Sequence, residues 1–285
     1  MKDFFITYNE YVFEQKFNSE KIDTNWEAFD KTAGGLYSSE LTVIGGKVSS
    51  GKTSFILRLM LFLLKSNHTV LFFNLQNSKY NVLNKIKEIE QEYPDAEISY
   101  DKTQNLFIYH HNEIYIDDIE IAINSKLDIN NKVIVFIDSL LNLTTKEHFN
   151  KSYYKINKII RTLKNLTVKY NLPIILTAGL NRNIYNYYKN RPSISEIKGS
   201  GEIEEFADKV ILMYSYDLSG ITENSEGTCI SGHNEIIVVK NRFYKRGAFI
   251  IKSLPSECFI DCTEEFDFTT YEKDRCTVEQ NDIMF

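Results

Sequence analysis

The 285-residue sequence has few of the residues that mark a disulfide-rich, metal-bound or low-complexity protein. It contains four cysteines, and none forms a Cys-x-x-Cys pair, so reduced structural thiols are favoured over a zinc site or a disulfide framework. With only four prolines it also lacks a proline-rich linker. These shortages indicate one large domain with terminal extensions.

Long apolar runs and an excess of positive charge are missing as well. The apolar run FILRLMLFLL at 55–64 is far too short to span a bilayer. Charges interrupt the N-terminal stretch MKDFFITYNEYVFEQKF, unlike a signal peptide. The net charge of −6 excludes a global basic field, so any nucleic-acid contact must be local. We expect a cytoplasmic protein with no membrane partner.

Short β-rich runs alternate with helical stretches along much of the chain. Several of the runs are apolar throughout, which is typical of strands buried on both faces. Strands are expected at 41–46, 69–75, 105–110, 133–138, 173–178, 209–214, 235–241 and 248–252, and helices at about 51–66, 79–92, 115–127 and 150–170. This order predicts an α/β fold with a mostly parallel sheet flanked by helices, ending in a hairpin at the sheet edge.

The strongest motif follows the first of these strands. Residues 46–53 read GKVSSGKT, which matches the P-loop pattern G-x-x-x-x-G-K-[ST]. In such a loop the backbone N–H groups surround phosphates, the lysine contacts the β- and γ-phosphates, and the last hydroxyl binds Mg²⁺. We therefore predict an ATP and Mg²⁺ site that uses residues Gly46, Ser49, Ser50, Gly51, Lys52, Thr53 and Ser54.

An acidic residue ends the buried strand VIVFID at 133–138. A carboxylate in that position is costly unless a positive charge lies opposite. Asp138 at the carboxyl edge of the sheet, beside the P-loop, is favoured as a second Mg²⁺ ligand with Thr53. The alternative is a carboxylate that caps the next turn.

The order of these elements resembles the C-terminal RecA-like motor domain of replicative hexameric helicases of the DnaB type. The resemblance covers about 24–255 and depends on five segments in the right order. They are TNWEAFDKTAGGLYSSELTVIGG (24–46), the P-loop, TAGLNRN (177–183), RPSISEIKGSGEIEEFADKVILMY (191–214) and IIVVKNRFYKRG (236–247). It implies a RecA-like P-loop fold, a role in DNA replication, and a homo-oligomeric ring, expected to be a hexamer, on single-stranded DNA.

The resemblance also implies roles for particular residues. Lys240 and Arg242 match the Lys-x-Arg pair that enters the neighbouring subunit's nucleotide site, where cations stabilise the charge on the transferred phosphoryl group. Otherwise they are two exposed basic residues on an edge strand. Lys198, Gly199 and Gly201 match a loop that faces single-stranded DNA, where glycines let the backbone approach phosphates.

Two departures from the family pattern affect hydrolysis. The family's glutamate that activates the attacking water is Gln76 here, and a γ-phosphate-sensing glutamine is replaced by Gly179. An amide can bind water but cannot accept its proton at neutral pH. One hypothesis is a site that binds ATP but hydrolyses it slowly or not at all. The other is that a nearby carboxylate substitutes, or that Gln76 suffices for a slow motor.

The expected domain boundaries are 1–22 for an N-terminal extension or linker helix, 23–255 for the motor, and 256–285 for an acidic mobile tail. The N-terminal segment docks on a neighbour or packs on its own domain. In the tail, Gln280, Ile283 and Phe285 resemble the short peptides that bind bacterial sliding clamps. The alternative is that these residues fold back or fray.

Three functional classes remain from the sequence. The first is a minimal ATP-dependent DNA helicase or translocase, with ATP hydrolysis weakened. The second is a hydrolysis-defective relative from a phage or mobile element, acting as an ATP-gated DNA-binding ring or as a decoy in another helicase's ring. The third, a RecA-like recombinase or clock-type ATPase, is weakened because the chain has no second RecA-like half and no Cys-rich module.

Overall fold

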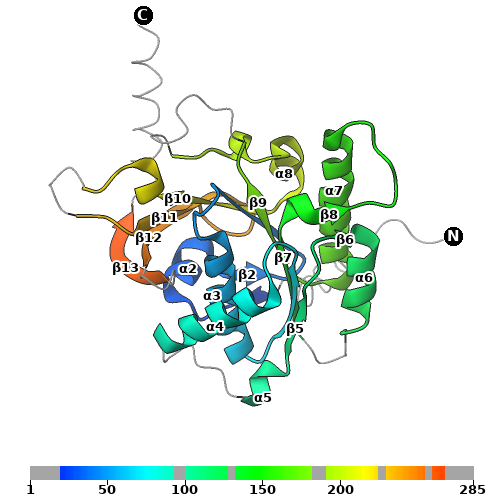
Figure 1. Cartoon of the computed structure of the whole chain (residues 1–285), viewed down its shortest axis with the longest axis horizontal. Coiled ribbons are helices and arrows are strands. Elements are labelled where there is room, and N and C mark those ends of the chain that lie inside the picture. The colour runs from blue at the N-terminus through cyan, green and yellow to red at the C-terminus, as the bar shows by residue number, and fades with distance from the viewer. Residues whose placement is uncertain are drawn as a thin grey trace, which may run out of the picture.

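The computed structural model describes residues 20–92, 100–127, 132–181, 191–223, 229–253 and 259–266. Within these ranges the chain builds a nine-stranded sheet in the order β13-β12-β11-β10-β3-β9-β7-β4-β5 (Figure 1). Its six parallel members are β3 (Leu41–Gly46), β4 (Thr69–Asn74), β5 (Leu106–Tyr109), β7 (Val133–Asp138), β9 (Ile174–Gly179) and β10 (Lys209–Ser215). The antiparallel members are β11 (His233–Asn241), β12 (Gly247–Ser253) and β13 (Phe259–Phe266).

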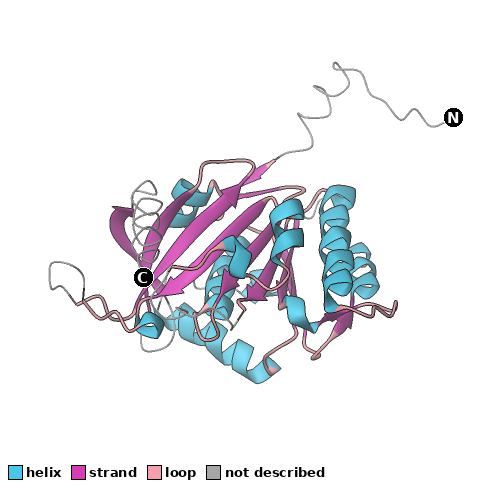
Figure 2. Cartoon of the chain, turned by 90° about the horizontal axis from the view of Figure 1, so that it is seen from above, coloured by secondary structure: helices cyan, strands magenta, loops and turns pink. Residues whose placement is uncertain are grey.

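Helices cover both faces of this sheet (Figure 2). Because side chains alternate across a strand, each strand contributes to two cores. In β7, for example, Val135 belongs to the core under one set of helices and Phe136 to the core under the other. The first set is α6 (Ile116–Asn124), α7 (Ser152–Tyr170) and α8 (Ser200–Phe206); the second is α2 (Glu27–Ala33), α3 (Lys52–Lys65) and α4 (Lys79–Glu92).

The expected α/β fold is confirmed, with all eight predicted strands and all four predicted helices present. The predicted hairpin is β11 and β12, which pair antiparallel, but it does not lie at the sheet edge because β13 pairs with β12 on the outside. Two short helices, α2 and α8, and the helical turn α5 (Tyr100–Thr103) are additional to the predicted elements. So are the small pairs of β1 (Lys21–Ile22) with β2 (Leu36–Tyr37) and of β6 (Ile114–Tyr115) with β8 (Leu143–Thr144).

Part of the predicted acidic tail is a strand of the sheet. Residues 259–266 form β13 and pair antiparallel with β12, so the prediction of a mobile tail from 256 is wrong for this segment. The acidic sequence FIDCTEEF is compatible with an edge strand, because such strands commonly carry charge. The predicted N-terminal linker helix lies almost wholly outside the described residues, as do Gln280, Ile283 and Phe285.

A buried ion pair joins the amino ends of β3 and β10. Lys209 and Glu40 are both fully buried, and the Lys209 Nζ lies 3.0 Å from Glu40 Oε1. The same ammonium donates a hydrogen bond to the Gly35 carbonyl oxygen. Burial raises the pKa of Glu40 more than the Lys209 charge lowers it. This pair joins the two strands at the amino edge of the sheet, whereas the predicted nucleotide-binding residues lie at the carboxyl edge.

Candidate nucleotide-binding site

The P-loop forms a tight turn between the end of β3 and the start of α3. At Gly46 an added Cβ would lie 2.4 Å from the Ser50 Oγ, so no other residue fits there without a shift. Gly51 has φ 84°, a left-handed conformation that glycine adopts at little cost, and it caps α3. Lys52, Thr53 and Ser54 then form the first turn of the helix, where N–H groups lack intrahelical partners. The loop therefore has the shape that an anion site requires.

Lys52 points its ammonium back into this loop. Its Nζ donates to the carbonyl oxygens of Gly46, at 2.9 Å, and Lys47, at 2.6 Å. Burial lowers the Lys52 pKa to about 8, against an opposing effect of the Asp138 charge. A buried ammonium with a lowered pKa gains when anionic oxygens come beside it. Lys52 is thus placed to hold phosphate.

Two serines of the loop differ in their surroundings. The Ser50 hydroxyl is buried and has no hydrogen-bond partner among the described residues. A buried hydroxyl of this kind is costly unless a ligand or water satisfies it. Ser49 is exposed, with φ 64° in the turn. The unsatisfied Ser50 hydroxyl therefore fits a bound phosphate group.

The Asp138 carboxylate lies next to the first turn of α3. It is 1% exposed, and its Oδ2 accepts a 2.7 Å hydrogen bond from the Thr53 hydroxyl. The other oxygen, Oδ1, accepts from the Thr177 hydroxyl of β9. The described residues include no cluster of three or more His, Cys, Asp or Glu side chains that could hold a metal. Thr53 and Asp138 supply two hard oxygen ligands, which fits Mg²⁺ because that ion keeps several waters and phosphate oxygens.

Gln76 follows β4 at the same edge of the sheet. Its side chain is exposed, and its Nε2 donates to the Ser139 Oγ at 2.5 Å and to the Asn142 Oδ1 at 3.5 Å. Leu75 N–H donates to the Asp138 carbonyl oxygen, so the two strand ends are also joined through the backbone. The structure therefore brings Gln76 to the edge that carries Asp138 and the P-loop.

Gly179 ends β9 and pairs in register with Gly46. A Cβ added at Gly179 would meet nothing within 4 Å, so the space for a longer side chain is open.

Glu196 is a carboxylate that could be considered as a replacement for the missing glutamate. Burial lowers the pKa of Lys47, and the charge of Glu196 opposes that effect. Its Oε2 already accepts from the Ser193 N–H in a capping box. This position leaves Glu196 poorly suited to replace a catalytic glutamate.

Lys240 and Arg242 lie away from this site, at the opposite edge of the sheet. Asn241 pairs with Lys209, which pairs with Thr42, four residues before Gly46, so Arg242 lies about five residues from the level of the P-loop. At about 3.3 Å per residue, that is about 17 Å. The Arg242 side chain therefore does not reach the P-loop of the same chain.

Both side chains are held at that edge by the segment around α8. Arg242 Nη1 lies 3.1 Å from the Asp208 Oδ1, and Lys240 Nζ donates to the Glu204 carbonyl oxygen. Asp208 is buried and also binds Lys164 Nζ at 2.7 Å and the Leu41 N–H at 2.8 Å. Asp208 was not predicted as a partner of Arg242. The acidic residue directly before the buried strand β10 could have indicated a buried carboxylate that needs a cationic partner.

The predicted DNA-facing residues form the turn that begins α8. Gly199 has φ 80°, and a Cβ there would lie 2.5 Å from the Ile156 Cγ2. Gly201 has open space around it, and Lys198 is half-buried. The Lys198 N–H donates to the Gly179 carbonyl oxygen at 3.0 Å. The turn is thus bonded directly to the strand end beside the P-loop. The tyrosine-rich sequence NIYNYYKN at 183–190, which could stack on bases or be a solvated loop, lies outside the described residues.

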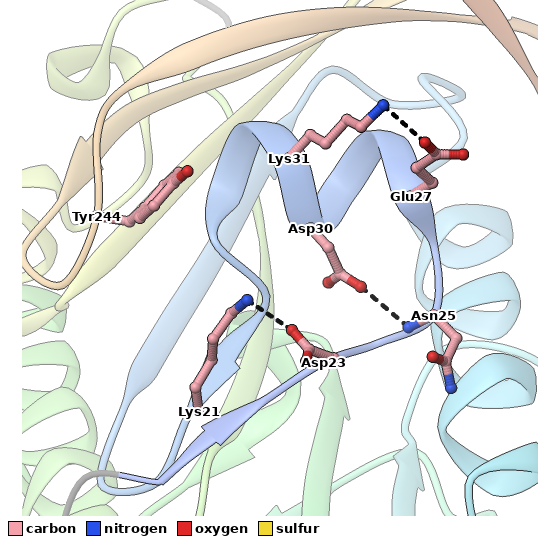
Figure 3. A pocket seen from close by; sticks show the side chains of 7 residues that line it. All are labelled: Lys21, Asp23, Asn25, Glu27, Asp30, Lys31 and Tyr244. Carbon is pink, nitrogen blue, oxygen red and sulfur yellow. Dashed lines mark hydrogen bonds and ion pairs between the residues drawn. The ribbon is translucent and has the colours of Figure 1, made fainter.

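A separate hollow of about 530 Å³ lies between β1, α2 and the turn after β11 (Figure 3). Its charged groups are paired with one another, as Lys21 with Asp23 at 2.6 Å and Lys31 with Glu27 at 2.6 Å. Asp30 accepts hydrogen bonds from Thr24 and from the Asn25 N–H at the start of α2. Because these carboxylates already have partners, we do not consider the hollow a ligand site.

Comparison with known proteins finds relatives of this sequence among DnaB-like helicases. The family model described as "DnaB-like helicase C terminal domain" matches residues 21–254. A replicative DNA helicase DnaB of Helicobacter pylori strain J99 is 29% identical over 212 residues, covering 68% of this chain and 43% of that protein. A probable replicative DNA helicase of Trieres chinensis is 27% identical over 274 residues, covering 82% and 57%. The chain spans about half the length of these curated relatives.

Solved structures share the fold at lower identity. A DnaB-like replicative helicase, studied with its primase interactions, aligns with a TM-score of 0.73 at 18% identity, over 89% of this chain and 65% of that one. A solved ATPase domain aligns with a TM-score of 0.72 at 18% identity, over 89% and 95%. These likenesses confirm the RecA-like fold. No helix within the described ranges has the length and apolar character to cross a membrane.

The pKa of Lys52 predicts that ATP binding depends on pH. Phosphates beside the ammonium favour its charged form, so binding takes up a proton when the pH is above about 8. ATP affinity should be constant below about pH 7 and fall by up to about tenfold per pH unit above 8. Isothermal titration in buffers of different ionisation enthalpy measures both effects. In Lys52→Arg, which stays charged, the slope should disappear; wild-type affinity that is flat to pH 9.5 would contradict the assignment.

Proposed function

The chain belongs to the family of DnaB-like helicase C-terminal domains, and from this premise we propose that it is an ATP-binding ring subunit that acts on single-stranded DNA with weakened hydrolysis. The motor is assigned to 23–255. The observation that carries the proposal is a complete phosphate and Mg²⁺ set beside an altered hydrolytic pair. Lys52, Thr53 and Asp138 lie together. At the two positions where the family has a water-activating glutamate and a phosphate-sensing glutamine, this chain has Gln76 and Gly179, and the space beside Gly179 is open.

The binding residues have separate roles in this proposal. Bound ATP and Mg²⁺ supply the phosphoryl group and the charge that activates it. The backbone N–H groups of 49–54 orient the phosphates, and the Ser50 hydroxyl donates to them. Lys52 exchanges its two carbonyl contacts for phosphate oxygens, and Thr53 with Asp138 hold the metal.

In an oligomeric ring, a neighbouring subunit can supply the cations that the nucleotide site of one chain lacks. Lys240 and Arg242 lie at the edge opposite their own P-loop, which supports a role in a neighbouring subunit's site. We propose a homo-oligomer, a hexamer by family resemblance, in which these cations complete the site of the next subunit. Lys198, Gly199 and Gly201 are proposed to face the DNA strand, and the hydrogen bond from Lys198 to Gly179 connects that turn to the nucleotide edge.

Weakened ATP hydrolysis is compatible with two functions. One is a slow replicative helicase or translocase in the cytoplasm. The other is an ATP-gated DNA-binding ring, or a decoy subunit, of a phage or mobile element. The second is favoured by Gln76, because an amide cannot take a proton from water at neutral pH. The sliding-clamp partner suggested for Gln280, Ile283 and Phe285 has no support from the comparisons and is not part of the proposal.

Steady-state ATPase assays with and without single-stranded DNA test the weakened site. Losing a positioned catalytic group typically costs about 10²–10³ in rate. Wild-type turnover should therefore lie well below the range of about 1–100 per second that is usual for phosphoryl transfer by kinases. Gln76→Glu should raise it, with ATP affinity unchanged. Wild-type turnover within that range would refute the weakened site.

ATP should promote assembly of the ring through Arg242. Mass photometry at micromolar protein with ATP and Mg²⁺ should show oligomers, and Arg242→Ala should reduce their fraction several-fold. Lys245→Ala removes one positive charge from the same turn and should leave assembly unchanged. A monomer under all of these conditions, or equal effects of the two variants, would contradict a role for Arg242 between subunits.

Lys198 should contribute to DNA binding and not to nucleotide binding. Lys198→Glu should weaken affinity for a fluorescent oligothymidine at least several-fold, because it reverses a charge beside the phosphate-approaching glycines. Lys87→Glu changes the net charge equally from the exposed face of α4 and serves as the control. Fluorescence anisotropy measures the difference; equal affinities of the two variants would exclude this turn as the DNA contact.

A further inference from the structure

A chain of side-chain hydrogen bonds links three segments at the carboxyl edge of the sheet. Asn142 Nδ2 donates to the Asn112 carbonyl oxygen at 2.9 Å. A backbone carbonyl oxygen can only accept hydrogen bonds. The amide nitrogen of Asn142 must therefore face Asn112, and its oxygen, Oδ1, faces the other way, towards Ser139. The Asn112 carbonyl oxygen thus fixes which atoms donate and which accept along this series of hydrogen bonds.

Ser139 carries this direction to position 76. Its buried hydroxyl donates its single hydrogen to the Asn142 Oδ1 at 3.3 Å. Its oxygen is then free only to accept, and it accepts from the Gln76 Nε2 at 2.5 Å. The Asn142 Oδ1 also faces that nitrogen at 3.5 Å. Residue 76 therefore meets two acceptors.

We propose that this edge is built for a hydrogen-bond donor at position 76, so that Gln76 is the matched residue and not merely a lost glutamate. The amide nitrogen is used by Ser139 and Asn142, which leaves the Gln76 Oε1 as the atom that accepts a hydrogen bond from a water at the γ-phosphate. Gln76 holds that water without taking its proton. Ser139 and Asn142 are positioning residues that act through Gln76. The role of the water rests on the proposed function.

A glutamate at 76 would conflict with this arrangement. An ionised carboxylate only accepts hydrogen bonds, and it would face the Ser139 oxygen and the Asn142 Oδ1. Ser139 could turn its hydrogen to the carboxylate only by leaving Asn142. Otherwise the acceptors favour the protonated acid and raise its pKa. Gln76→Glu alone should therefore raise ATPase activity less than a carboxylate at position 76 would if it did not face these two acceptors.

Removing the Asn142 amide should relieve the conflict. Asn142→Leu has a similar size and no polar atoms, so the Ser139 hydrogen becomes free to turn to a carboxylate. Steady-state ATPase kinetics on wild type, Gln76→Glu, Asn142→Leu and the double variant test the coupling. We expect a rise in kcat of a few-fold in Gln76→Glu and at least about tenfold more in the double variant, with KM little changed. In Asn142→Leu alone, kcat should fall. If the two effects simply multiply, the proposal is overturned.

A second readout needs no turnover. In the protein without nucleotide, a raised carboxyl pKa in Gln76→Glu stabilises the protonated folded form. Stability relative to wild type should then decline as the pH rises from about 4 and level off near neutrality, measured as the urea midpoint. The decline should shrink in the Asn142→Leu background. Gln104→Glu makes the same chemical change at an exposed turn and should show no decline.

The two proposals can fail separately. If none of the four proteins binds a fluorescent ATP analogue, the proposed function fails, while the urea midpoints still decide which atoms face position 76. If nucleotide binds but Gln76→Glu shows the flat pH profile of Gln104→Glu, position 76 does not face acceptors, and the inference is wrong whatever the ATPase rates are.

Discussion

The carboxylate of Asp138 is the group on which the arrangement of this site depends. It is almost fully buried, yet both of its oxygens accept hydrogen bonds from hydroxyls, those of Thr53 and Thr177. Through these two contacts one side chain on β7 fixes the first turn of α3 and the end of β9. A buried carboxylate without such partners would be costly, so the hydroxyls and the carboxylate require one another. The P-loop, the proposed Mg²⁺ ligands and the position of Gly179 are consequently set relative to one point.

Much of the fold could be predicted from the sequence because each central strand is a short, nearly continuous apolar run. Strands buried on both faces have that pattern; β3, which precedes the P-loop, and β7, which ends in Asp138, are examples. β13 was not predicted because the sequence of an acidic edge strand resembles that of a solvent-exposed tail. Helix α8 was missed because its seven residues, SGEIEEF, are too few to show a helical period.

The candidate site was predictable only where a local motif specifies it. GKVSSGKT sets the phosphate loop within eight residues, so its members could be named in advance. The partners of Gln76 could not, because Ser139 and Asn142 are 63 and 66 residues away. Thr177 did leave a signal. A hydroxyl within the apolar strand β9 needs a buried partner, and the adjacent strand ends in the carboxylate that supplies it.

The group around Asp208 has a consequence for the proposed role of Arg242 in a neighbouring subunit. Arg242 shares the Asp208 carboxylate with Lys164 and the Leu41 N–H, which both contact the other carboxyl oxygen. If Arg242 swings out towards another subunit, the buried Asp208 keeps its neutralising lysine and its backbone donor. The departure therefore leaves no orphaned charge inside the domain. The Arg242 guanidinium can therefore leave Asp208 and return to it without disturbing the fold.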